Sequence, residues 1–225
     1  MMRLRIVVLL LIALSSVNAS AQNNLSAEEK AKYVKAITER ADKIVATLDV
    51  KDSNKSETVR NTIRDQYSNL NDIYIIRDAK LKEIKEKNAD NKVERDSAIA
   101  KQNRNTEASL SKLHKKYIGK LASNLSEIQI EQVKNGMTYN VLPITYKAYQ
   151  EQILTLTDEQ KKQILIRLTE AREHAIDAES SDKKHAWFGK YKGRINNYLS
   201  AAGYDLKKEG VEWEKRRKAA AEKAN

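Results

Sequence analysis

The sequence contains no cysteine, a single proline and six glycines in 225 residues. Without cysteine the chain can form neither a disulfide framework nor a thiolate metal site. The scarcity of turn formers and the abundance of Lys, Glu, Ala and Leu favour helices over strands. Beyond residue 21, no apolar run approaches the ~18 residues of a membrane-spanning helix, so we expect no membrane span there.

The first 21 residues have the pattern of a signal peptide. Arg3 and Arg5 precede an apolar run at residues 6–14, which is too short to span a bilayer. The small residues at 19–21 (ASA) form a signal-peptidase site, and no cysteine follows that would make a lipoprotein. We therefore expect export to the periplasm or the cell exterior, with an uncleaved N-terminal anchor as the alternative. Residues 22–225 then form a single all-helical domain.

The net charge is +11, and removal of Arg3 and Arg5 leaves +9. A basic exported protein meets acidic glycans and anionic envelope surfaces, so we expect no nucleic acid partner. The alternative is that the interleaved Lys and Glu residues form ordinary solvated helix faces.

Apolar residues recur every three or four positions over most of the chain, which predicts an all-α fold built as a multi-helix bundle. The expected helices cover residues 27–48, 55–87, 92–121, 126–136, 144–154, 157–176, 184–202 and a segment after 205. The apolar spacing fades between about 76 and 110, with a turn at 88–91. This indicates a long antiparallel hairpin that protrudes from the core, or else a disordered segment. Asn135-Gly136 is the expected helix end, followed by a loop at residues 137–143 that contains Pro143.

Capping residues mark three helix starts. Ser26 with Glu29, Ser126 with Gln129, and Thr157 with Gln160 have the spacing of capping boxes. The last two lie in the segments LSEIQ and LTDEQ, which resemble the repeated motif of the Spy/CpxP-like periplasmic chaperones. That resemblance implies unfolded or envelope proteins as partners, held near Leu125 and Leu156. Capping alone also explains the motif, and the chain lacks the Met-rich and Gln-rich composition of such chaperones.

Aromatic and basic residues concentrate in a C-terminal module at about 171–213. Aromatic faces beside cationic and amide side chains suit acidic oligosaccharides, because the guanidinium group of arginine binds a carboxylate through two parallel hydrogen bonds. The candidate ligand-binding residues are His185, Trp187, Lys190, Tyr191, Arg194 and Asn197. Gly189 and Gly193 would leave a groove on the same helix. The alternative is that Trp187 and Tyr191 are core anchors.

One helix face has the composition of an acid/base or metal site. Glu170 and His174 are four residues apart, and Asp177 follows three later, so one face presents two carboxylates and an imidazole, with His185 as a possible addition. No catalytic motif accompanies them. We therefore predict no catalytic residue, metal or cofactor, and keep a glycan-active enzyme as an alternative.

Several long segments resemble a family of exported helical proteins from Bacteroidetes that is known as a domain of unknown function. They are ITERADKIVATL (37–48), IRDQYSNLNDI (63–73), NGMTYNVLPITYKAY (135–149) and AREHAIDAESSDKKHAWFGKYKGRINNYLSAAGYDL (171–206), with Trp213. The resemblance implies a link to polysaccharide utilisation and supplies no catalytic residues. We expect a non-catalytic binding or accessory protein of the bacterial envelope, with a periplasmic holdase chaperone or a glycan-active enzyme as alternatives.

Overall fold

The computed structural model describes residues 26–224, which form eight α-helices and no strand. The all-α prediction is therefore confirmed. The helices are α1 (Ala27–Val45), α2 (Ser53–Lys87), α3 (Lys92–Ala122), α4 (Glu127–Met137), α5 (Val141–Gln152), α6 (Asp158–Ile176), α7 (Ser181–Ala201) and α8 (Leu206–Ala224). The predicted signal peptide, residues 1–21, lies outside the described residues.

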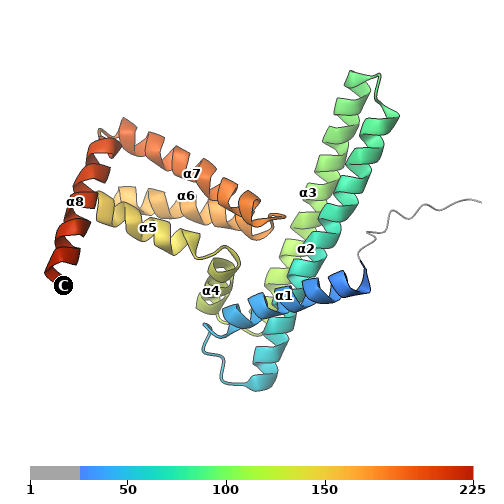
Figure 1. The fold of residues 1–225 in the computed structure, drawn as a ribbon, viewed down its shortest axis with the longest axis horizontal. Coiled ribbons are helices and arrows are strands. Elements are labelled where there is room, and N and C mark those ends of the chain that lie inside the picture. Colours follow the sequence, from blue (N-terminus) through green and yellow to red (C-terminus); the bar gives the residue numbers. More distant parts are fainter. Residues whose placement is uncertain (1–25, 225) are drawn as a thin grey trace, which may run out of the picture.

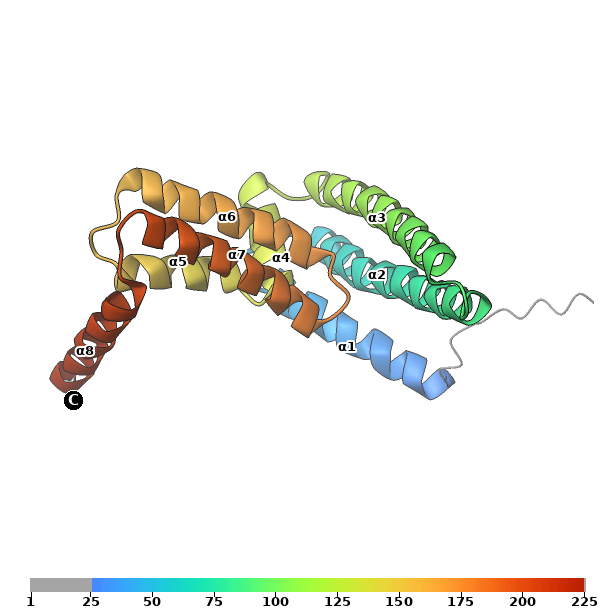
Figure 2. The ribbon, with the colours of Figure 1, turned by 90° about the horizontal axis from the view of Figure 1, so that it is seen from above.

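The helices form two arms that meet at the short helix α4 (Figure 1). One arm contains α1 and the long hairpin of α2 and α3. The other contains α5, α6 and α7, which run side by side, with α8 at the far end (Figure 2). Each arm has its own cluster of buried apolar residues. Ile176, at the end of α6, is completely buried in the cluster of the first arm, so the C-terminal end of α6 connects the two arms.

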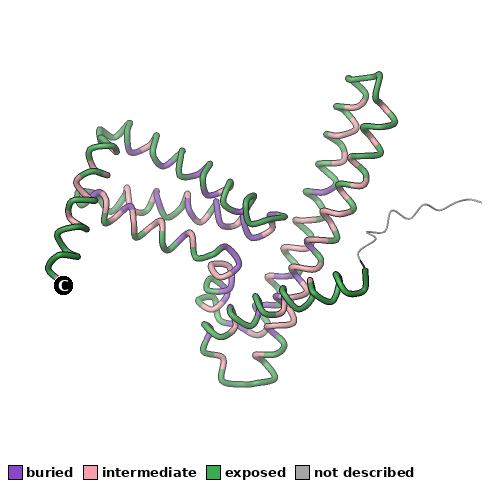
Figure 3. The backbone as a smooth tube through the Cα atoms, in the orientation of Figure 1, coloured by how far each residue is buried: buried purple, intermediate pink, exposed green. Residues whose placement is uncertain are grey.

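The hairpin protrudes as the sequence predicts. Asp52 caps the start of α2, and after the turn at 88–91 Asn91 caps α3 by accepting a hydrogen bond from Glu94 N at 3.1 Å. Between residues 76 and 110 only Thr106 is buried, and Figure 3 shows the outer half of the hairpin as a mixture of exposed and intermediate residues. The helices continue through this segment because each helix end is capped, although little apolar surface is buried there.

All three predicted capping boxes are present. Ser26, Ser126 and Thr157 each accept a hydrogen bond from the backbone N–H three residues later, and the N3 side chain returns the contact. Gln129 also donates to the carbonyl of Leu48 at 2.9 Å, which fixes α4 against the end of α1. Leu125 and Leu156 are both buried, so the motif anchors helix starts to the core.

Helix α4 ends at Met137, close to the predicted end near Asn135-Gly136, but its C-cap is Thr138 and not Gly136. Gly136 lies inside the helix, where a Cβ atom would be only 2.8 Å from Cγ1 of Ile44. Glycine is needed here for the close approach of α1 to α4, and not for a left-handed cap.

The predicted loop at 137–143 is a turn of three residues, 138–140. Tyr139 and Asn140 have positive φ angles of 58° and 55°, and Asn140 N donates to the carbonyl of Asn135 at 2.8 Å. Helix α5 begins at Val141, so Pro143 lies in its first turn, where the missing N–H has no helical partner to lose.

Candidate functional site

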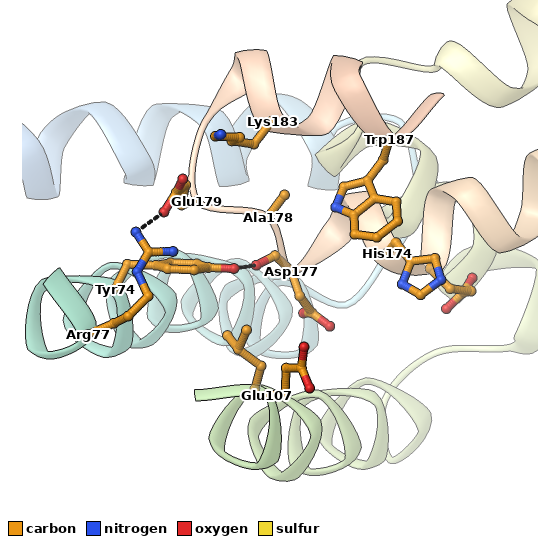
Figure 4. Close-up of a pocket in the computed structure, with 11 residues that line it drawn as sticks. Tyr74, Arg77, Glu107, His174, Asp177, Ala178, Glu179, Lys183 and Trp187 are labelled. Carbon is orange, nitrogen blue, oxygen red and sulfur yellow. Dashed lines mark hydrogen bonds and ion pairs between the residues drawn. The ribbon is translucent and has the colours of Figure 1, made fainter. Parts of the chain in front are cut away.

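A cleft of about 520 Å³ lies between the hairpin and the connection from α6 to α7. In Figure 4, Tyr74 and Arg77 of α2 lie on one side of this cleft, and Trp187 and His174 lie on the other. Glu107 of α3 approaches it from below in that view. The cleft is lined by Tyr74, Arg77, Glu107, Leu110, Glu173, His174, Asp177, Ala178, Glu179, Lys183 and Trp187.

Polar contacts hold the hairpin wall of the cleft to the end of α6. The hydroxyl of Tyr74 donates to the carbonyl of Asp177 at 2.7 Å, and burial raises the pKa of Tyr74 to about 12, so the donor keeps its proton. Arg77 pairs with Glu179 in the connection between α6 and α7. These contacts place both arms around one cavity.

His114 of α3 makes the third such contact. Its Nδ1 lies 2.7 Å from a carboxylate oxygen of Asp177, whose other oxygen accepts from Gln66 at 3.3 Å. The hydrogen bond to Asp177 raises the pKa of His114 above its usual 6.5, and the opposing effect of burial is smaller. The imidazolium and carboxylate therefore form an ion pair under mildly acidic conditions.

Beside the cleft, Arg172 forms a buried cluster of charges between α4 and α6. The guanidinium is 2% exposed, donates to Asn135 Oδ1 at 2.8 Å, and pairs with Glu131 and Glu173. Lys134 also pairs with Glu173 at 3.1 Å. The carboxylate of Glu173, which lines the cleft, is thus already neutralised by two cations.

Trp187 stands at the mouth of the cleft with its ring stacked on His174. The ring centroids are 4.3 Å apart and the planes differ by 13°. The ammonium of Lys190 lies 4.9 Å from the indole centroid. Two further cations lie over aromatic rings on the same pair of helices, namely Arg194 over Tyr191 and Arg167 over Tyr198.

Most of the candidate ligand-binding residues lie on one face of α7. At about 100° per residue they occupy roughly one third of the helix circumference. We call this face the α7 stripe, and it consists of Lys183, Trp187, Lys190, Tyr191, Arg194 and Asn197. Its lysines, Arg194 and Asn197 are exposed, Trp187 is half-buried, and Tyr191 is 5% exposed beneath Arg194.

His185 does not belong to this surface. It lies about 200° around the helix from Trp187 and stacks on Tyr139 of the α4–α5 turn, with centroids 5.3 Å apart. No other helix approaches Gly189 or Gly193 closely, because no atom of another element would lie within 4 Å of a Cβ at either position.

The structure does not bring Glu170, His174 and Asp177 together as an acid/base set. Asp177 is bound by His114, His174 is stacked on Trp187, and Glu170 is exposed. Helical spacing places the three residues on adjacent turns, but Asp177 and His174 each contact a residue of another helix. Within residues 26–224 no group of His, Asp or Glu side chains has the arrangement of a metal site.

Sequence reasoning missed His114, Glu107 and Arg172. Glu107, Leu110 and His114 follow one another at helical spacing on α3, and all three face the second arm. The signal was available, since a charged or titratable residue inside an apolar stripe often has a buried partner. The identity of that partner depends on the tertiary structure.

The fold and cleft define an all-helical protein with a candidate ligand site between two arms. Comparison with family models matches residues 34–219 to the family described as Protein of unknown function (DUF3826). The chain belongs to this family. A search of curated proteins found no significant match. In the described part of the chain, no helix combines the length and apolar character required to cross a membrane.

Proposed function

We propose that this protein is an exported, non-catalytic binding protein of the bacterial envelope, and that it holds an acidic glycan on the α7 stripe. The observation that carries the proposal is the charge of α7, which has Asp182 as its only acidic residue. Lys183, Lys190 and Arg194 form no ion pair with a carboxylate in the described part of the chain. Such unpaired cations on one face attract a polyanion.

The aromatic residues position these cations. Lys190 and Arg194 lie over Trp187 and Tyr191, whose rings are fixed against the apolar cluster of the second arm. Because the rings already restrict the side chains, less conformational entropy is lost when a ligand carboxylate binds them. Arg194 offers a planar fork for a carboxylate or sulfate, and Lys190 adds a point charge one turn away.

This arrangement favours a glycan over the two alternatives. A chaperone surface at Leu125 and Leu156 is disfavoured because both leucines are buried. An enzyme based on His174 is disfavoured because His174 stacks on Trp187 and Asp177 pairs with His114, and His174 forms no hydrogen bond or ion pair with Glu170 or Asp177 within residues 26–224. The resemblance to exported proteins linked to polysaccharide utilisation supports the same choice.

Titration calorimetry with oligogalacturonate, using the chain without its predicted signal peptide, tests the proposal. The double variant Lys190→Gln/Arg194→Gln should weaken binding about tenfold or more, since each charge-assisted hydrogen bond contributes about 1.5–3 kcal/mol. The matched control is Lys192→Gln/Lys208→Gln, which removes the same charge from exposed positions outside the stripe.

Equal losses in the two double variants would mean non-specific charge attraction and would overturn the site. Absence of binding to oligogalacturonate and to sulfated dextran would overturn the proposal as a whole. Export is tested separately by fractionating cells that express the full chain. A secreted or periplasmic product beginning at Gln22 is expected, and a cytosolic product with an intact N-terminus would contradict this part.

A further inference from the structure

The cleft and the α7 stripe form one continuous surface, because Lys183 and Trp187 belong to both. A glycan bound along the stripe therefore reaches the cleft at its Trp187 end. The volume of about 520 Å³ lies within the range of ligand pockets, roughly 300–1,000 Å³. The chemistry of the cleft differs from that of the stripe, and this difference indicates what part of a glycan it accepts.

The charges that line the cleft do not favour an acidic sugar unit. Its walls carry four carboxylates, those of Glu107, Glu173, Asp177 and Glu179, against the cations Arg77 and Lys183. Arg77 is already paired with Asp78 and Glu179. Glu173 is paired with Arg172 and Lys134, and Asp177 with His114, which leaves Glu107 and Lys183 as the charges without an ion pair within residues 26–224. The cleft therefore has no excess of positive charge that would attract an acidic sugar unit.

The hydrogen-bonding groups that remain free suit hydroxyl groups. The indole N–H of Trp187, the carboxylate of Glu107 and the ammonium of Lys183 have no side-chain hydrogen-bond partner within residues 26–224. In Figure 4 the nitrogen-bearing edge of Trp187 is turned toward the cleft. Two donors and one acceptor can bind sugar hydroxyls, which both donate and accept. Leu110 and Ala178 add apolar wall for the C–H face of a ring.

We infer that the cleft is a subsite for a neutral, hydroxyl-rich sugar unit, next to acidic units of the same chain on the α7 stripe. This inference rests on the proposed function and narrows its ligand to a glycan that contains both kinds of unit. Glu107 and Trp187 are the residues that select the neutral unit. The α7 stripe thus binds the acidic units of the ligand, and the cleft binds its neutral unit.

The test uses titration calorimetry to compare two oligosaccharide probes that carry the same number of carboxylates. Hyaluronan oligosaccharides alternate acidic and neutral sugars, and oligogalacturonate is acidic throughout. We expect the wild-type chain to bind the alternating probe about fivefold more tightly or better. Glu107→Gln should remove this preference without weakening the binding of oligogalacturonate. Trp187→Phe, which removes the indole N–H and keeps an aromatic ring beside Lys190, should reduce the preference as well. Asp96→Asn, which removes an exposed carboxylate from the same helix α3, is the control and should keep the preference.

The outcomes separate this inference from the proposed function. If both probes bind equally and only Lys190→Gln/Arg194→Gln weakens them, the neutral subsite is wrong and the stripe stands. If neither probe nor sulfated dextran binds, both proposals fail. A glucosamine oligomer that binds more tightly than hyaluronan, and that loses affinity in Glu107→Gln and in high salt, would show that the cleft binds an amino sugar. The assignment of the cleft to a neutral sugar unit would then be wrong.

Discussion

Nδ1 of His114 lies 2.7 Å from a carboxylate oxygen of Asp177 and so connects α3 of the hairpin to the residue that ends α6. The two residues are 63 positions apart in the sequence. The same carboxylate also accepts a hydrogen bond from Gln66 of α2. One side chain at the end of α6 therefore holds both helices of the hairpin against the second arm.

This contact predicts a pH-dependent stability. The hydrogen bond to Asp177 raises the pKa of His114 above 6.5 in the folded chain. Its stabilising contribution is therefore complete below pH ~6.5 and is lost as the pH rises through the folded-state pKa. Thermal melts in steps from pH 5.5 to 8 should show a loss of stability that is much smaller in His114→Asn. His185→Asn, which removes an imidazole without a carboxylate partner, should behave like the wild type. An unchanged pH profile in His114→Asn would contradict the assignment.

Lys184 predicts the opposite dependence at higher pH. Its ammonium is buried and donates to the carbonyls of Ala175 and Ile176 at 3.1 Å each, and burial lowers its pKa to about 8. Between pH 8 and about 10.5 the unfolded chain holds a proton that the folded chain has released, so this group makes stability rise with pH. Chemical denaturation at pH 8, 9 and 10 should show that Lys184→Met lacks this contribution. The exposed Lys183→Met serves as control, and a rise that persists in Lys184→Met would refute the prediction.

Two glycines in helix interiors should respond to alanine in opposite directions. Gly136→Ala should destabilise the protein by about 1–3 kcal/mol, because its Cβ would overlap Ile44 at the contact between α1 and α4. Gly119→Ala adds a methyl group where no atom of another element lies within 4 Å, and should stabilise by about 0.5–1 kcal/mol. Urea denaturation measures both changes. Equal effects at the two positions would show that helix propensity alone decides the outcome.

The α4–α5 turn should tolerate glycine better than alanine at position 140. Asn140 has a φ of 55°, and its side chain makes no capping hydrogen bond. Both substitutions remove the amide, so their difference isolates the backbone conformation. Asn140→Ala should be less stable than Asn140→Gly by about 1 kcal/mol, since a Cβ disfavours the left-handed region. Melting temperatures of the two variants provide the comparison, and alanine matching glycine would argue against this backbone geometry.

Much of the fold was predictable because its signals are local. Ser126 with Gln129 and Thr157 with Gln160 define helix starts through contacts three residues apart, and apolar spacing identifies the buried face of each helix. The protruding hairpin followed from a loss of apolar spacing along α2 and α3. These features depend on neighbours in the sequence, so no knowledge of the tertiary structure was required.

The partners of the site residues were not predictable in this way. Helical spacing offered His174 as the neighbour of Asp177, but the carboxylate meets His114 of another helix, and His174 instead stacks on Trp187. His185 was grouped with Trp187 by sequence proximity, yet it lies on another side of α7 against Tyr139. The sequence suggested Gly136 as a helix cap, but in the structure it allows Ile44 of α1 to pack closely against α4.

The sequence by itself determined the helices, their caps and the concentration of positive charge on α7, because each depends on residues within about one or two helical turns. Only the tertiary structure decided that α2, α3, α6 and α7 meet around one cleft. That arrangement depends on contacts such as Tyr74 with Asp177 and Arg77 with Glu179, which join positions about 100 residues apart. Periodicity within a helix fixes which face is apolar, and it contains no information on which distant helix covers that face.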